Sequence, residues 1–125
     1  MNEQRASRFE LAQVALEVVG AAAAVTCAFT VPQGERWRVV WGLTSQDDAA
    51  HTHYFTLTRD GVGKVLNEPF TTAANTRYQF YTYVIMPECL IMRYGDVLSS
   101  TSNAMAAGKQ ITFHLLVEKL IGESA

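Results

Sequence analysis

The strict alternation of apolar and small polar residues is the feature of this sequence that most constrains its fold. The segment Val25–Val31 reads VTCAFTV, and the same period of two recurs in Trp37–Thr44, His53–Thr58 and Ile111–Glu118. Successive side chains of a β-strand point to opposite faces, so this period predicts half-buried strands. With the shorter apolar segments between them, seven or eight strands are expected. A chain of 125 residues with so many evenly spaced strands predicts a single all-β domain, an antiparallel β-sandwich.

Turn residues suggest how neighbouring strands connect. Pro32–Glu35 carries a proline and a glycine, and it predicts a hairpin between strands 25–31 and 37–44. Tyr94–Asp96 predicts a second hairpin between strands 90–92 and 97–101. Asp60-Gly61 predicts a tight turn after the strand that starts near His53.

Two segments rich in aromatic residues are expected to be buried by other parts of the fold. Tyr78–Met86 is apolar or aromatic on both faces, which predicts a strand covered on both sides. In the strand 37–44, simple alternation places Trp37 and Trp41 on one face with Val39 and Leu43. We therefore expect both tryptophans in the core rather than in a sugar-stacking platform.

The N-terminal segment 1–24 is the part least typical of a strand, and residues 25–125 are assigned to the sandwich. Phe9, Ala12, Leu16 and Val19 fall at helical spacing, and Gly20 is suited to end a helix. Val14, Leu16 and Val18 also alternate, so an extended arm leading into the first strand is the alternative. Either form is expected to dock on a neighbouring surface.

Composition bears on partners and on the cellular compartment. The formal net charge is −2 and the basic residues are scattered, which argues against nucleic acid. The apolar run Val14–Val31 is interrupted by polar residues and by Gly20, so no membrane span is expected. The N-terminus Met1–Arg5 is polar and mixed in charge with no apolar core directly after it, so no signal peptide is expected. Cys27 falls on an apolar strand face and is expected to be a small buried residue, whereas the pairing of Cys89 stays open. Cytoplasmic synthesis is the expectation.

The sequence offers little chemistry typical of an enzyme. His51 and His53 alternate on one strand, as metal ligands do in cupins, but no carboxylate follows at the spacing such a site needs, and His114 belongs to a distant strand. Asp47-Asp48 is expected to bond turn backbone or water. We therefore expect no enzyme activity, catalytic residue, metal or cofactor.

Three segments resemble small structural proteins of tailed bacteriophages: Thr30–Val39 (TVPQGERWRV), Arg93–Leu98 (RYGDVL) and Ile111–Lys119 (ITFHLLVEK). The chain resembles capsid decoration (cement) proteins over roughly residues 25 to 119 as a pattern. The resemblance implies a jelly-roll sandwich that forms a homotrimer, binds the major capsid protein and clamps neighbouring capsid subunits. It also implies a location on the capsid surface of the virion.

Such a protein needs contact surfaces rather than a catalytic pocket, and tyrosine is well suited to contacts because it combines large area with a polar tip. The alternatives are a tail, neck or fibre-adaptor component, and a ligand- or glycan-binding jelly roll. The candidate interface residues are Phe9, Leu11, Leu16, Tyr54, Tyr78, Tyr81, Tyr83 and Tyr94.

Overall fold

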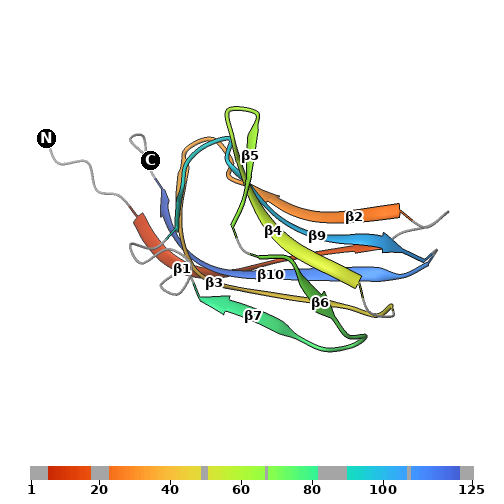
Figure 1. The fold of residues 1–125 in the computed structure, drawn as a ribbon. Coiled ribbons are helices and arrows are strands. Elements are labelled where there is room, and N and C mark those ends of the chain that lie inside the picture. The colour runs from red at the N-terminus through yellow and green to blue at the C-terminus, as the bar shows by residue number, and fades with distance from the viewer. Residues whose placement is uncertain are drawn as a thin grey trace, which may run out of the picture.

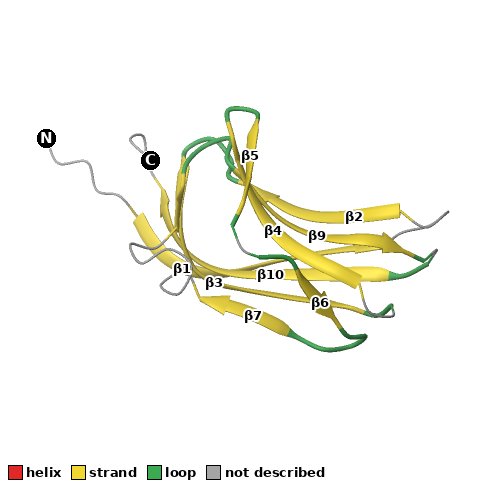
Figure 2. Cartoon of the chain, viewed as in Figure 1, coloured by secondary structure: helices red, strands yellow, loops and turns green. Residues whose placement is uncertain are grey.

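The structure is a computed structural model that describes residues 6–17, 23–48, 51–66, 68–81, 90–106 and 108–121. The described residues form two antiparallel sheets that face each other, and they contain no helix (Figures 1 and 2). Sheet A consists of β1 (Ala6–Glu17), β10 (Gln110–Ile121), β3 (Glu35–Gln46), β7 (Tyr78–Tyr81) and β8 (Leu90–Met92). Sheet B consists of β2 (Ala23–Thr30), β9 (Val97–Met105), β4 (His51–Arg59), β5 (Val62–Val65) and β6 (Phe70–Thr72).

The strand pairs are nested as in a jelly roll. β1 pairs with β10, β2 with β9, β3 with β8 and β4 with β5, so the chain behaves as one long hairpin wrapped into two layers. β5 and β6 both pair with β4, while β7 and β8 both pair with β3. If β5 and β6 are counted as one strand position, and β7 and β8 as another, the ten strands fill eight positions. The all-β sandwich predicted from the sequence is confirmed.

Two predicted hairpins are wrong, although their turns are present. Gly34 and Gly95 adopt the left-handed conformation, with φ of 85° and 87°. However, β2 and β3 belong to different sheets, and so do β8 and β9. Both turns are therefore corners that carry the chain from one layer to the other. The corners lie side by side, because Val31 N donates to Asp96 O and Gly95 N donates to Val31 O, both at 3.0 Å.

The N-terminal segment is a strand where it is described. Over Ala6–Glu17 the helical alternative is wrong, because β1 is extended and pairs with β10 along its whole length, from Ala6 opposite Ile121 to Glu17 opposite Gln110. Residues 1–5 and 18–22 lie outside the described part of the chain. β1 is therefore an edge strand of sheet A, and it pairs within its own chain.

The core lies between the sheets and is centred on aromatic rings. Phe113 of β10 contacts Phe29 of β2 and Phe55 of β4, with ring centroids 5.4 and 5.8 Å apart. Cys27 is fully buried beside them, as expected for a small apolar residue, and burial raises the pKa of its thiol to about 11. Cys89 lies outside the described residues.

A β-bulge in β3 divides that strand into two halves with opposite facing. The register between β10 and β3 shifts at Val117, so that Val117 pairs with Val39 while Leu116 pairs with Trp41, and Val40 is the extra residue. Trp37 and Val39 are buried, whereas beyond the bulge the buried positions are Gly42, Thr44 and Gln46. The expectation that Trp41 and Leu43 share the core face of Trp37 is therefore wrong. One inserted residue turns them to the outside of the sandwich.

Candidate assembly surfaces

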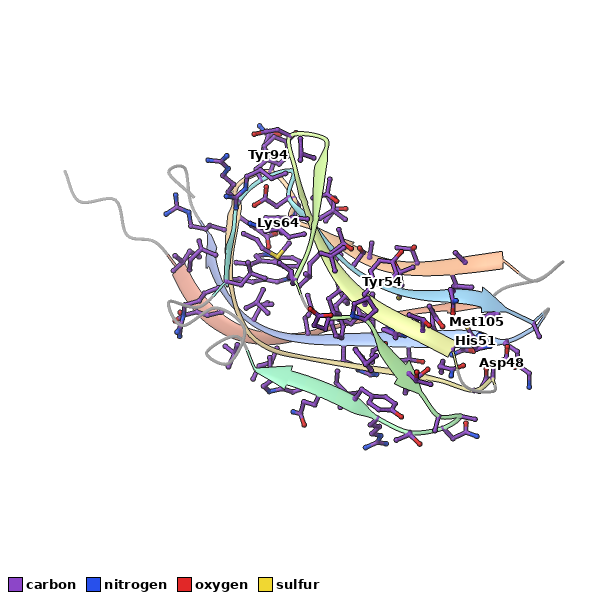
Figure 3. The ribbon with its side chains drawn as sticks, viewed as in Figure 1. Asp48, His51, Tyr54, Lys64, Tyr94 and Met105 are labelled. Carbon is purple, nitrogen blue, oxygen red and sulfur yellow. The ribbon has the colours of Figure 1, made fainter. Side chains whose placement is uncertain are left out.

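One end of the sandwich carries the most exposed apolar side chains of the described residues. We call this region the hairpin end; it consists of the β4–β5 turn with Val62 and Val65, and of Tyr94 in the neighbouring corner. Val62 is 70% exposed, Val65 50% and Tyr94 63%. Figure 3 shows Tyr94 and Lys64 together at this end, far from Asp48 and His51 at the opposite end. The Asp60-Gly61 turn predicted from the sequence is confirmed, with φ values of 53° and 79°.

An ion pair fixes the two parts of the hairpin end to each other. Arg59 Nε donates at 3.0 Å to both carboxylate oxygens of Asp96, and Arg59 Nη2 donates to Ile91 O at 3.1 Å. Asp96 also accepts from Arg93 N at 3.0 Å. Burial by itself raises the pKa of Asp96, but the hydrogen bonds from Arg59 and Arg93 N and the two positive charges hold it below its ordinary value. The turn at the tip is therefore held in place by a buried carboxylate.

A second apolar surface covers the outside of sheet A. We call it the outer face of sheet A and define it by the outward residues of β3, β8 and β10. Trp41, Leu43, Leu116 and Leu120 are half-buried there, and Ile91 is 43% exposed. Arg38 Nε donates to Glu118 Oε1 at 2.9 Å in the middle of this face.

The predicted interface residues are distributed over several surfaces. In the register of sheet A, Leu11 lies opposite Leu116, Phe9 opposite Glu118, and Tyr81 opposite Trp41. Tyr94 lies at the hairpin end. Leu16 pairs with Ile111, a core position, and Tyr83 lies outside the described residues.

The remaining two predicted interface tyrosines have other surroundings. Tyr78 is only partly buried and packs against Phe70, with ring centroids 5.3 Å apart, while its hydroxyl accepts from Ala73 N at 2.8 Å. Tyr54 is half-buried in β4, opposite Thr101 of β9, on the outer side of sheet B. Figure 3 places Tyr54 away from both ends of the sandwich.

Sequence reasoning missed the centre of the outer face. Leu115 and Leu116 are consecutive, so alternation alone requires one of them to face outward, and this is a signal that the sequence does contain. For Trp41 and Leu43 the sequence gives no such signal. The extra residue Val40 stands between the apolar residues Val39 and Trp41, so its position cannot be recognised from the pattern.

A polar pocket adjoins the strand ends opposite the hairpin end. It has a volume of about 260 Å³ and is lined by Ser45, Gln46, Asp47, Asn75, Arg77, Gln110 and Thr112. Ser45 and Thr112 are opposite each other in register, on the same side of sheet A as Leu43. The pocket therefore continues the outer face with hydrogen-bonding groups.

The three histidines of the metal hypothesis lie in different surroundings. His53 is fully buried, its Nε2 hydrogen-bonds Ser100 Oγ and Thr44 Oγ1, and its Nδ1 has no hydrogen-bond partner. His51 Nε2 lies 2.9 Å from Asp48 Oδ2. His114 is on the other side of sheet A, where burial and the charge of Arg77 lower its pKa. Among the described residues no group of three His, Cys, Asp or Glu side chains could hold a metal ion.

The two aspartates of the β3–β4 loop bond the backbone, as their position predicts. Asp47 Oδ1 accepts from Gln110 N at 2.8 Å, and Asp48 Oδ2 accepts from Ala106 N at 2.7 Å. They tie the loop to the neighbouring connection between β9 and β10.

Comparison with known proteins finds similar folds but assigns the chain to no family. No protein-family profile and no curated protein matches this sequence. A chain from the Bacillus endospore appendages, which form disulfide-linked pili, is similar with a TM-score of 0.55 at 16% identity, covering 98% of this chain and 95% of that one. A chain from the virus-like particle of the extra small virus of the prawn Macrobrachium rosenbergii is similar with a TM-score of 0.50 at 10% identity, covering 94% and 80%. The chain thus has a jelly-roll fold shared with proteins of a virus-like particle and of a pilus. Within the described residues, no helix has the length and apolar character needed to cross a membrane.

Proposed function

We propose that this chain is a structural virion protein that decorates the capsid by binding neighbouring major capsid subunits. The observation that carries the proposal is the hairpin end, where three apolar side chains are exposed beside the Arg59–Asp96 ion pair. Large exposed apolar residues gathered on a rigid end are typical of interaction sites. Fold-level likeness to a protein of a virus-like particle supports the same class of function.

The motifs that resemble phage decoration proteins add support, because two of them meet in space. Residues 30–39 include the β2–β3 corner and residues 93–98 include the β8–β9 corner, and these corners hydrogen-bond each other through Val31, Gly95 and Asp96. The second corner also presents Tyr94. In this proposal the two motifs build the base of the capsid-binding end, and the protein has no catalytic role.

The number of copies per particle tests the proposal. Quantitative mass spectrometry of purified virions from the source virus should count this chain at a number comparable to that of the major capsid protein. A few copies per particle would favour a tail, neck or fibre-adaptor position, and absence from the particle would overturn the proposal.

Variants of the hairpin end test the surface itself. A Val62→Asp/Val65→Asp double variant should lose binding to capsids stripped of this protein while keeping its circular dichroism spectrum. Thr52→Asp, also at an exposed strand position but remote from the hairpin end, is the matched control and should bind as the wild type. Binding retained by the double variant would contradict the assignment of this end.

One observation favours a second candidate function, glycan binding. Trp41 is on the outside of sheet A, and the polar pocket with Arg77 lies further along the same strands. An aromatic platform beside hydrogen-bonding side chains suits a sugar. Glycan-array binding that is lost in both Trp41→Ala and Arg77→Ala would support this function, whereas an array without signal would remove it.

A further inference from the structure

The two outer faces of the sandwich differ in chemistry. The outer side of sheet B is rich in hydroxyls, and its central strands satisfy one another: Thr26 Oγ1 and Thr101 Oγ1 are 3.0 Å apart, and Ser99 Oγ donates to Thr56 O at 3.3 Å. Tyr54 is the aromatic residue there. Such a face is compatible with water and needs no cover.

The outer face of sheet A has the opposite character. Trp41 of β3 lies opposite Leu116 of β10, and Leu43 follows two residues along β3. Beyond the Arg38–Glu118 pair, Leu120 and Ile91 of β8 add further apolar side chains. Several large apolar side chains gathered on the outside of one sheet are typical of an interface.

The β-bulge at Val40 creates this face. Without the extra residue, alternation from Trp37 would bury Trp41 and Leu43 and would turn Gly42 and Thr44 outward. The sequence instead places a glycine and a hydrogen-bonded threonine inside and a tryptophan outside. Thr44 Oγ1 bonds Ser100 Oγ at 2.8 Å in the core, which fixes this orientation.

Charge indicates which partner fits. Arg38 and Glu118 are paired at 2.9 Å within the apolar area, with side chains 40% and 24% exposed, so the face presents both signs side by side. A face of this kind is complementary to itself, because a symmetry-related copy can set its Glu118 against Arg38 of the first. A capsid surface of one dominant charge would not be matched in this way.

We propose that the outer face of sheet A is the self-association surface of this protein, and that its occupant is the same face of a second copy. The proposal rests on the proposed function, in which several copies act together, and it assigns the hairpin end to the capsid and the outer face of sheet A to the oligomer. A contact between the same face of two copies is related by a twofold axis, so the proposal predicts a dimer.

Sedimentation velocity of the purified chain tests the proposal. The wild type should sediment as a dimer. Trp41→Ser and Ile91→Glu should each shift the distribution to the monomer by weakening association at least tenfold. Tyr54→Ser on the hydroxyl-rich face is the matched control and should associate as the wild type. Circular dichroism and thermal melts establish that each variant is folded; Ile91→Glu, at a 43% exposed position, keeps the test open if Trp41→Ser fails to fold.

Charge reversal tests the contact between copies directly. Arg38→Glu and Glu118→Arg should each associate weakly alone, because like charges then face each other, and an equimolar mixture should associate more strongly than either variant. A monomeric wild type at high concentration, or a mixture no better than its components, would overturn the proposal. A wild type that is monomeric in solution but abundant on virions would overturn this inference and leave the proposed function standing.

Discussion

His53 of β4 and Ser100 of β9 form a hydrogen bond at the centre of the sandwich, where both side chains are fully buried. Burial lowers the pKa of His53 to about 4, whereas an exposed histidine in the unfolded chain titrates near 6.5. Between these values the unfolded chain binds more protons than the folded one. The stability due to neutral His53 is therefore complete above about pH 6.5 and is lost as the pH falls toward 4, by about 3 kcal/mol in all.

Urea unfolding at a series of pH values checks this dependence. The His53→Gln variant should show a much flatter decline between pH 6.5 and 5 than its parent. Both proteins are best compared in a His114→Gln background, because burial and Arg77 also lower the pKa of His114. Equal slopes with and without His53 would show that this histidine is not the titrating group.

Asp96→Asn should destabilise the protein by about 1–3 kcal/mol at pH 7, because it removes the charge from a buried acceptor of Arg59 and Arg93 N. The pKa of Asp96 is lowered in the folded protein, so its contribution is present above about pH 4 and is lost as the pH falls below it. The difference between the two proteins should accordingly narrow in acid. Chemical denaturation measures it.

The matched control for this ion pair is Asp60→Asn. Asp60 is 86% exposed and lies 3.7 Å from Arg93, so its removal should cost less than about 1 kcal/mol. Equal losses from the two substitutions would contradict the role assigned to burial of Asp96.

Deletion of Val40 should destabilise the sandwich by several kcal/mol, because the halves of β3 can then no longer both keep their buried faces. Removal of one residue turns either Trp37 and Val39 outward or Gly42 and Thr44 outward. Val40→Thr keeps the residue count and should cost no more than about 1 kcal/mol. Thermal melts of the two variants compare them, and similar melting temperatures would show that the bulge is dispensable.

Cys27 should react with a thiol reagent only when the protein unfolds. The side chain is fully buried and its pKa is raised to about 11 by burial, so almost no accessible thiolate exists at neutral pH. In a Cys89→Ser variant Cys27 is the remaining cysteine of the two. Its rate of labelling should rise with denaturant along the unfolding curve, and fast labelling of the native protein would contradict the buried position.

The alternation of apolar and polar side chains was sufficient to predict the sandwich, because a strand with one buried face shows this period of two in any sheet. It could not specify which strands pair. A Pro-Gly turn such as Pro32–Glu35 suits a hairpin and an inter-sheet corner equally, and only contacts distant in sequence, such as Val31 with Asp96, decide between them. Asp60-Gly61 was predicted correctly because a two-residue turn with two positive φ angles specifies its hairpin locally.

The candidate surfaces were harder to predict than the fold. A bulge of one residue is not recognisable in the sequence pattern. The outward positions of Trp41 and Leu43 therefore become known only from the register of β3 with β10. The tyrosines were chosen by residue type, and the structure disperses them. The interface assignment of Phe9, Leu11 and Tyr81 stays a prediction. In register, Leu11 and Tyr81 share a row with Trp41, which alternation had placed in the core.

The pairing of β1 with β10 has a consequence for how the molecule is made. Ala6 lies opposite Ile121, so β1 can pair only after β10 has been synthesised. β9, the partner of β2, is also synthesised late. Contacts so distant in sequence slow folding, and a ribosome must release most of the chain before either layer can close. Until then the alternating strands are exposed as unpaired edges, and we expect the yield of soluble protein to depend on synthesis rate and on chaperones.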